Sequence, residues 1–149
     1  MVAYAKATTL SNRQRKFMTI QYRTNTDLSA EELSSLFEKS GIRRPINDLQ
    51  RLQRMIDHAN LTITAWDGGK LVGVARSLTD FSYCCYLSDL AVDRDYQGKG
   101  IGSELVQKVR VAIGEECNLL LVSAPAAMGF YPKIGMQAVE TGWIIKRTK

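Results

Sequence analysis

The chain has 149 residues, of which 45% are apolar and 23% are charged, and these values are ordinary for a globular protein. This length predicts one domain with a core of its own, and we see no second domain. No stretch approaches the roughly 18 apolar residues of a membrane-spanning helix. The first residues also lack the apolar run of a secretion signal, so we expect neither membrane insertion nor secretion.

The formal net charge is +5, from 20 basic and 15 acidic residues. Much of the excess lies near the two ends, so the composition favours a soluble basic enzyme over a nucleic-acid-binding protein. There are three cysteines, two of which are adjacent. They predict no disulfide framework and no Cys-x-x-Cys metal site, and we therefore expect a protein of the reducing cytoplasm without a bound metal.

The N-terminal residues differ from the rest of the chain. Residues 1–17 are polar and basic without a clear period, and we expect a flexible extension that precedes a single domain over residues 18–149. Met18 is a candidate for the functional start of the protein. The first ordered pattern predicts a short strand over Thr19–Arg23.

Two helices follow in the chain. Ser29 and Glu32 have the spacing of a capping box, which predicts a helix that begins just after Ser29. Gly41 is the expected end of that helix. Apolar residues at helical spacing predict a second helix from Asn47, which can cap it, to Ala59.

The second half of the chain is dominated by strands. Three strands are expected at Leu61–Trp66, Leu71–Leu78 and Tyr83–Val92, and the first two flank a strong hairpin turn at Asp67–Lys70. The rest predicts a helix over Gly102–Ile113, a buried strand at Leu119–Val122, a short helix over Ala126–Ile134 and a final strand over Gln137–Lys146. The order is β-α-α-β-β-β-α-β-α-β, with the strands before and after the third helix expected to be parallel.

The most informative segment is the loop Asp93–Ser103, between the strand that ends at Val92 and the following helix. It carries glycines at three alternate positions, Gly98, Gly100 and Gly102. Glycine lets another molecule approach the backbone closely, and free amides that open a helix attract anions. The loop is therefore predicted to bind a pyrophosphate.

Two familiar phosphate loops fit this segment poorly. A P-loop needs a lysine followed by serine or threonine, whereas Lys99 stands between glycines. A dinucleotide fingerprint has the spacing Gly-x-Gly-x-x-Gly early in a βαβ unit, but here the spacing is Gly-x-Gly-x-Gly and occurs late in the chain.

The segment Gln97-Gly98-Lys99-Gly100-Ile101-Gly102 resembles the Gln/Arg-x-x-Gly-x-Gly/Ala loop of the GNAT superfamily of N-acetyltransferases. About thirty residues later, Ala127–Met136 resembles the Ala-x-x-Phe-Tyr-x-Lys-x-Gly-Phe segment of the same family. Together the resemblance covers roughly Thr19–Lys146. It implies the GNAT fold, of the α/β (α+β) class: a mixed, mostly antiparallel sheet with a central splayed parallel pair, flanked by helices.

The resemblance also implies acetyl-coenzyme A as cosubstrate, a small amine or a peptide of unknown identity as acceptor, and direct attack of the amine on the thioester. The loop would hold the pyrophosphate through residues Gln97, Gly98, Lys99, Gly100, Ile101, Gly102 and Ser103. The backbone of the preceding strand, at Leu90, Ala91 and Val92, would pair with the pantetheine arm, and the Val92 amide is a candidate oxyanion donor. Both roles use the backbone, so the same residues can equally be core residues or solvent-facing ones.

Two catalytic side chains are predicted. Tyr131 matches the family tyrosine that protonates the thiolate, and a phenol is protonated at neutral pH. Asp89 is the sole carboxylate on the strand Tyr83–Val92, where it can act as a base or be structural; no glutamate is present there, and Tyr86 occupies a place where a base is expected. Ala124 stands where the family often has an asparagine that contacts coenzyme A.

Several alternatives stay open from sequence. A non-catalytic acyl-coenzyme A-binding sensor would keep the same loop, and homodimers are common in the family. The loop from Gly41 to Asn47 and the final strand are expected to shape the acceptor site, where Arg43 and Arg44 could favour an acidic acceptor or simply be solvated. His58, the single histidine, is expected at the surface or at the boundary of the core. Cys84 and Cys85, in an apolar strand, are expected to pack and not to act as nucleophiles, and Trp66 and Trp143 are expected to lie in the core or to line a pocket.

Overall fold

The computed structural model describes residues 20–149, so the predicted extension and Met18 lie outside the described residues. Five strands form one sheet in the order β1 to β5. The strands are β1 (Ile20–Thr24), β2 (Leu61–Asp67), β3 (Lys70–Thr79), β4 (Cys84–Val92) and β5 (Asn118–Leu120). The first four are antiparallel neighbours, and β4 and β5 are parallel, which confirms the predicted mixed sheet.

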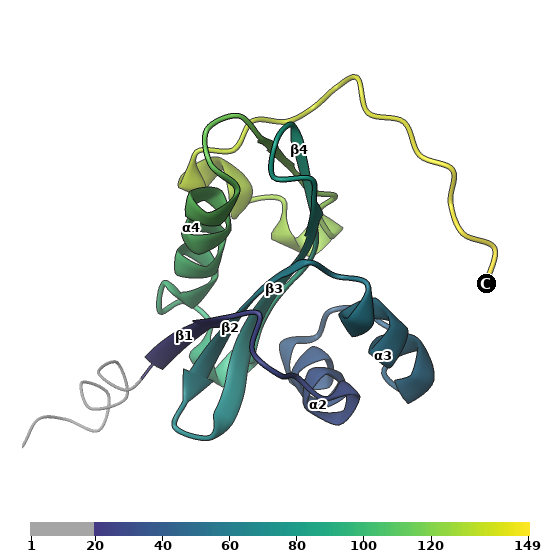
Figure 1. Ribbon diagram of the computed structural model, residues 1–149, viewed down its shortest axis with the longest axis vertical. Helices are drawn as coiled ribbons and strands as arrows, with labels where there is room; N and C mark the ends of the chain where they lie inside the picture. The colour runs from purple at the N-terminus through teal and green to yellow at the C-terminus, as the bar shows by residue number, and fades with distance from the viewer. Residues whose placement is uncertain (1–19) are drawn as a thin grey trace, which may run out of the picture.

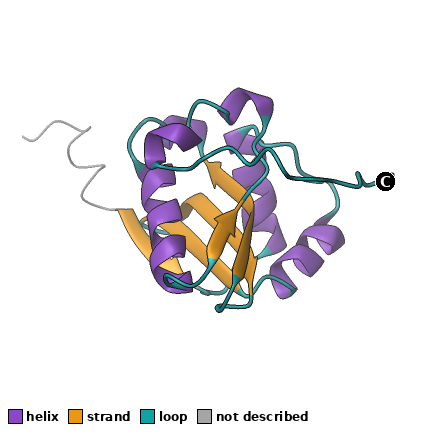
Figure 2. Cartoon of the chain, turned by 90° about the horizontal axis from the view of Figure 1, so that it is seen from above, coloured by secondary structure: helices purple, strands orange, loops and turns teal. Residues whose placement is uncertain are grey.

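Three α-helices cover the two faces of this sheet (Figure 1, Figure 2). They are α2 (Ala30–Ser40), α3 (Leu49–Asp57) and α4 (Ile101–Ile113). One apolar core lies between the sheet and α4, where Leu105 and Val109 pack against strand residues such as Val72. A second core lies under α2 and α3, where Phe37 and Leu52 pack with Val74. The predicted α+β class is therefore confirmed, with one face of the sheet for each helical layer.

The first helix has the predicted start and end. The Ser29 hydroxyl accepts from the Glu32 amide at 3.1 Å, and the Glu32 carboxylate accepts from the Ser29 amide at 3.0 Å. Gly41 ends α2 with φ at +80°, a left-handed conformation that favours glycine. The second helix differs from the prediction, because Asp48, not Asn47, caps α3 by accepting from the Arg51 amide at 2.9 Å. Asn47 belongs to the turn in which the Asp48 amide donates to the Pro45 carbonyl.

Strand β4 carries a bulge that matters for the site. Arg76 pairs with Asp89, but the next β3 residue, Ser77, pairs with Leu87, so Ser88 has no opposite residue. A bulge shifts the alternation of side chains between the two faces of a strand. Tyr86 and Asp89 thereby come to the α2–α3 side of the sheet, because Leu87 belongs to the α4 core and Ala91 to the other.

The last third of the chain contains the main departures from the prediction. The strand expected at 119–122 is shorter, Asn118–Leu120, and only partly buried. Two short 3₁₀-helices, η2 (Pro125–Ala127) and η3 (Tyr131–Ile134), replace the predicted helix over 126–134. No strand forms over 137–146; this segment extends past the sheet and ends on the α3 side (Figure 1).

Exposure corrects two of the predicted buried residues. Trp66 is buried as expected, but Trp143 is 97% exposed, because the final segment pairs with no strand among residues 20–149. Cys85 is buried in the α4 core, whereas Cys84 at the start of β4 is exposed. No helix within residues 20–149 combines the length and the apolar character that crossing a bilayer requires.

Candidate functional site

The glycine loop leads directly into the N-terminus of α4. Gly98 and Gly100 have φ values of +72° and +83°, and a Cβ on either would meet no atom within 4 Å. Within residues 20–149, the backbone amides from Gly98 to Ser103 donate no hydrogen bond to the protein; the first amide to do so is that of Glu104, to the Gly100 carbonyl at 3.0 Å. Six consecutive free donors at a helix N-terminus form an anion-binding site.

Buried side chains brace this loop from behind. The 3₁₀-helix η1 (Arg94–Tyr96) precedes the glycines, and Tyr96 is 4% exposed. Its hydroxyl donates to the Asp67 carboxylate at 2.6 Å. Burial, and then this hydrogen bond, raise the pKa of Tyr96 to about 12. The loop is therefore anchored to the β2–β3 hairpin by a neutral phenol.

Two of the predicted loop side chains turn back onto the protein. The Gln97 amide donates to the Val92 carbonyl at 2.8 Å and fixes the start of the loop to the end of β4. The Lys99 ammonium donates to the Asp95 carbonyl at 2.9 Å and lies 5.2 Å from the centre of the Tyr96 ring. The positive charge of Lys99 thus stays on the loop, where it adds to the field of the free amides.

Strand β4 has a free edge that runs toward the loop. Its pairing with β5 ends at Tyr86, which faces Leu120, while β4 continues to Val92. On the other side of β4, the Asp93 amide donates to the Val72 carbonyl. Every second residue that precedes Asp93 in β4 therefore also directs its amide to β3. Ala91 therefore bonds to β3, and Leu90 and Val92 direct their backbone groups to the free edge. This edge can accept an extended ligand as an added strand.

Tyr131 lies beside the beginning of α4. The ring of its neighbour Phe130 approaches Gly102, where an added Cβ would lie 3.4 Å from Phe130 Cζ and 3.8 Å from Val92 Cγ2. The Phe130 and Tyr131 rings make an edge-to-face contact at 5.2 Å. Burial raises the pKa of Tyr131, so its hydroxyl stays protonated at neutral pH. Ala124 caps η2 without a side-chain hydrogen bond and offers no polar group at this place.

Asp89 is fully buried and carries two ion pairs. Its Oδ1 accepts from Arg44 Nε and its Oδ2 from Arg76 Nε, both at 2.5 Å. Both carboxylate oxygens are therefore occupied by guanidinium groups. This arrangement favours the structural role that the sequence left open beside the role of a base.

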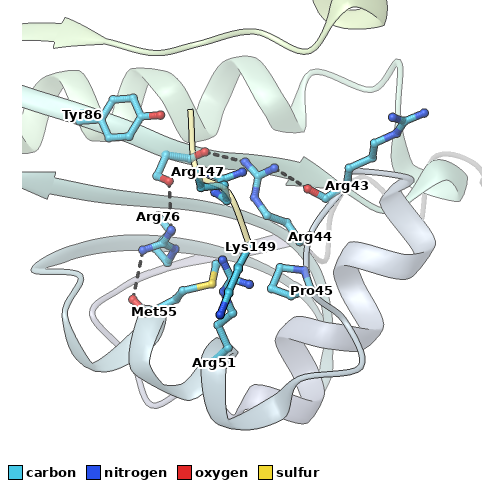
Figure 3. Close-up of a pocket in the computed structure, with 10 residues that line it drawn as sticks. Arg43, Arg44, Pro45, Arg51, Met55, Arg76, Tyr86, Arg147 and Lys149 are labelled. Atoms are coloured by element: carbon cyan, nitrogen blue, oxygen red, sulfur yellow. Dashed lines mark hydrogen bonds between the residues drawn. The ribbon is translucent and has the colours of Figure 1, made fainter. Parts of the chain in front are cut away.

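A cavity of about 490 Å³ opens over this ion-pair cluster, on the α2–α3 side of the sheet (Figure 3). Its lining comes from the α2–α3 loop, α3, β3, β4 and the C-terminal segment: Arg43, Arg44, Pro45, Arg51, Met55, Arg76, Tyr86, Ser88, Arg147 and Lys149.

Sequence reasoning pointed to Arg43, Arg44 and Tyr86 here but missed Arg51, Arg76, Ser88, Arg147 and Lys149. A signal existed for one of them, because Arg76 and Asp89 are opposite charges within two apolar strands that are neighbours in the chain. Among residues 20–149, no three histidine, cysteine, aspartate or glutamate side chains are grouped so that they could hold a metal ion.

Comparison with known proteins agrees with this geometry. The model of the acetyltransferase (GNAT) family matches residues 25–136, and the chain belongs to this family. The family uses acetyl-coenzyme A. An uncharacterized N-acetyltransferase, ycf52-like, from Prochlorococcus marinus is 30% identical over 132 residues, which are 84% of this chain and 70% of that protein.

Two further proteins are similar to the chain. Probable acetyltransferase TAP2 from Glycine max is 27% identical over 133 residues, which cover 83% of this chain but 54% of that protein, so the chain spans about half the length of this relative. The crystal structure of a putative acetyltransferase from Deinococcus radiodurans R1 has the same fold, with a TM-score of 0.72 and 24% identity. That match covers 89% of this chain and 92% of the other.

Proposed function

We propose that this domain transfers the acetyl group of acetyl-coenzyme A to the nitrogen of an amine. The observation that carries the proposal is the continuity of two unsatisfied backbone surfaces. The free edge of β4 ends beside six free amides at the N-terminus of α4. An extended arm with a pyrophosphate at one end can pair with the edge and place its phosphates on the amides.

The residues fit this donor without help from side-chain charges. The amides from Gly98 to Ser103 would bind the pyrophosphate, and the Val92 amide and the Leu90 carbonyl would bond to the amide groups of the arm, because the Val92 carbonyl already accepts from Gln97. Acetyl-coenzyme A supplies an activated acetyl thioester. The expected oxyanion donor, the Val92 amide, lies at the pyrophosphate end of this edge, so the Leu90 amide, which is nearer the thioester, is the proposed donor to the thioester carbonyl oxygen as negative charge develops there.

Tyr131 is the proposed general acid. The acceptor nitrogen bonds to the acetyl carbon, the carbon–sulfur bond breaks, and the thiolate takes the phenolic proton. The proton that the new amide nitrogen releases returns through water to the Tyr131 phenolate. The raised pKa of Tyr131 keeps this proton in place at neutral pH. Asp89 is assigned to structure, because both its oxygens are engaged by arginines. The amine would lose its proton to water, or arrive at the site already neutral.

Two measurements test this function in sequence. Thermal unfolding with acetyl-coenzyme A, and with NADH and ATP as controls, tests the donor site: at 100 times the Kd, specific binding stabilises by about 2.7 kcal/mol. Release of free thiol in the presence of a panel of amines then tests transfer. Stabilisation by acetyl-coenzyme A without thiol release in the presence of any amine would favour a non-catalytic acyl-coenzyme A sensor. No stabilisation would contradict the proposed donor site.

A further inference from the structure

The cavity over Asp89 collects positive charge. Six of its lining side chains are basic, and none of the lining side chains is acidic: the basic residues are Arg43, Arg44, Arg51, Arg76, Arg147 and Lys149. They come from four parts of the chain: the α2–α3 loop, α3, β3 and the C-terminal segment. Arg43, on the loop, turns its side chain outward, whereas the side chains of Arg44, Arg51 and Arg76 lie around one space (Figure 3).

Only part of this charge is balanced by the protein. Asp89 pairs with Arg44 and Arg76, whose side chains are 28% and 7% exposed. Within residues 20–149, the side chains of Arg43, Arg51, Arg147 and Lys149 have no acidic partner and no hydrogen bond. Like charges that share a site repel one another, and an anion that enters the cavity would relieve this repulsion.

The floor of the cavity is fixed in place. Arg44 Nη2 donates to the Ser88 carbonyl at 2.8 Å, and Arg76 Nη2 donates to the Ser88 hydroxyl at 3.0 Å. Arg76 Nη1 also donates to the Met55 carbonyl at 3.1 Å. The guanidinium groups of Arg44 and Arg76 are therefore already ordered before a ligand binds. Binding would then cost little additional side-chain entropy at these two residues. Guanidinium groups match carboxylates and phosphates because they can donate two parallel hydrogen bonds.

The cavity lies at the end of the free β4 edge that is farther from the glycine loop. Tyr86 and Ser88 line it, and Tyr86 is the residue at which β4 and β5 stop pairing. From Leu87 to Val92 the free edge spans about 16 Å of strand, with the glycine loop beyond its far end. A donor that lies along the edge with its phosphates on the loop would bring its acyl end toward this cavity.

We propose that the cavity binds the acceptor, and that the acceptor is a small amine carrying at least one carboxylate or phosphate group. This inference rests on the proposed acetyl transfer and adds the class of substrate. The volume, about 490 Å³, lies in the range of small-molecule sites. The free cations bind the anionic group, and the amine faces the β4 edge.

The test compares amines of similar shape and different charge. Initial rates of thiol release are measured with phosphoethanolamine against ethanolamine, with β-alanine against β-alaninamide, and with spermidine as a polycationic amine. We expect kcat/KM to be at least about tenfold higher for the anionic member of a pair. Equal rates within both pairs, or a preference for spermidine, would overturn the inference while leaving the proposed acetyl transfer intact.

Two variants on α3 test whether the preference for anionic amines arises in the cavity. Arg51 lines the cavity, whereas Arg54, one turn later on the same helix, is exposed and does not line it. We expect Arg51→Gln to raise KM for the anionic amine about tenfold and to leave KM for acetyl-coenzyme A unchanged, and Arg54→Gln to change neither. Equal effects of the two variants would mean that the cavity does not select the acceptor.

A binding measurement decides the case in which no amine of the panel reacts. The protein is saturated with coenzyme A, so that the glycine loop is occupied, and its unfolding temperature is measured with phosphoethanolamine or ethanolamine. Stabilisation by phosphoethanolamine alone, lost in Arg51→Gln and kept in Arg54→Gln, would support the anionic cavity. No difference between the two compounds would overturn it, whereas a failure of acetyl-coenzyme A to stabilise the protein would count against the donor site.

Discussion

Arg76 and Asp89 face each other across β3 and β4, with Arg76 Nε and Asp89 Oδ2 2.5 Å apart and both side chains buried. Arg44, from the α2–α3 loop, takes the other oxygen of the same carboxylate. Asp89 therefore connects the sheet to the loop that forms one wall of the cavity. Its negative charge also offsets the charges of Arg44 and Arg76, which would otherwise repel each other at the floor of the cavity.

Replacement of this carboxylate should destabilise the fold. In Asp89→Asn two guanidinium groups lose their counter-charge, and we expect a loss of about 3–5 kcal/mol in the free energy of unfolding, measured by urea denaturation. Asp57→Asn, a change at an exposed position on α3, should cost under about 0.5 kcal/mol. A variant Asp89→Asn that kept its stability but lost kcat would instead identify Asp89 as the base.

Tyr131 should act in the chemical step. We expect Tyr131→Phe to lower kcat by about 10²–10⁴, the usual contribution of a general acid, with KM for acetyl-coenzyme A changed less than about twofold. Tyr83→Phe, at a position that is 74% exposed, serves as the control and should leave both constants unchanged. An unaltered kcat in Tyr131→Phe would remove the acid from the mechanism.

The pH profile gives a second view of Tyr131. Its ordinary pKa is 10.0, and burial raises it, so the hydroxyl is protonated at every pH below that value. We therefore expect no alkaline loss of kcat from this group until the pH exceeds about 10. Stopped-flow rates, measured briefly at each pH, would show it, and a loss of kcat centred near pH 8 that disappears in Tyr131→Phe would contradict the raised pKa.

The Val92 amide can be removed separately from its side chain. Because this amide faces the free edge, Val92→Pro deletes a donor without deleting a hydrogen bond between β3 and β4. We expect KM for acetyl-coenzyme A to rise about tenfold in Val92→Pro, the equivalent of one lost hydrogen bond to the arm, and to stay within about threefold in Val92→Ala, which keeps the amide. If both variants raised this KM equally at equal unfolding temperature, the side chain and not the amide would be responsible.

Local signals in the sequence predicted the elements that depend on local interactions. The capping box at Ser29 and the left-handed Gly41 involve neighbours in the chain, so the bounds of α2 followed from the residues. The same reasoning failed for 137–146, where the apolar pattern favours a strand but no partner strand is available in the described residues. The exposed Trp143 shows that pairing, and not propensity, decides such a segment.

The candidate site likewise has one part that local sequence predicts and one part that only the folded chain brings together. The glycine loop is contiguous in sequence, and its free amides follow from its spacing. The basic cavity is assembled from the α2–α3 loop, α3, two strands and the C-terminal segment, so its charges come together only in the folded protein. The bulge at Ser88, which brings Asp89 under Arg44 and Arg76, likewise depends on the register between β3 and β4.

The donor site is tested most directly by calorimetric titration of acetyl-coenzyme A into three proteins: the wild type, Gly100→Ala and Gly114→Ala. Both glycines lie at ends of α4 with positive φ, +83° and +76°, and a Cβ on either would meet no atom within 4 Å. With ψ at −175°, Gly114 is the more strained position for alanine, so this control carries at least as much backbone strain as Gly100→Ala. We expect Kd to rise at least about tenfold in Gly100→Ala, equivalent to about 1.4 kcal/mol, and to stay at the wild-type value in Gly114→Ala. No binding to the wild type, or equal affinity in all three proteins, would contradict the assignment of this loop.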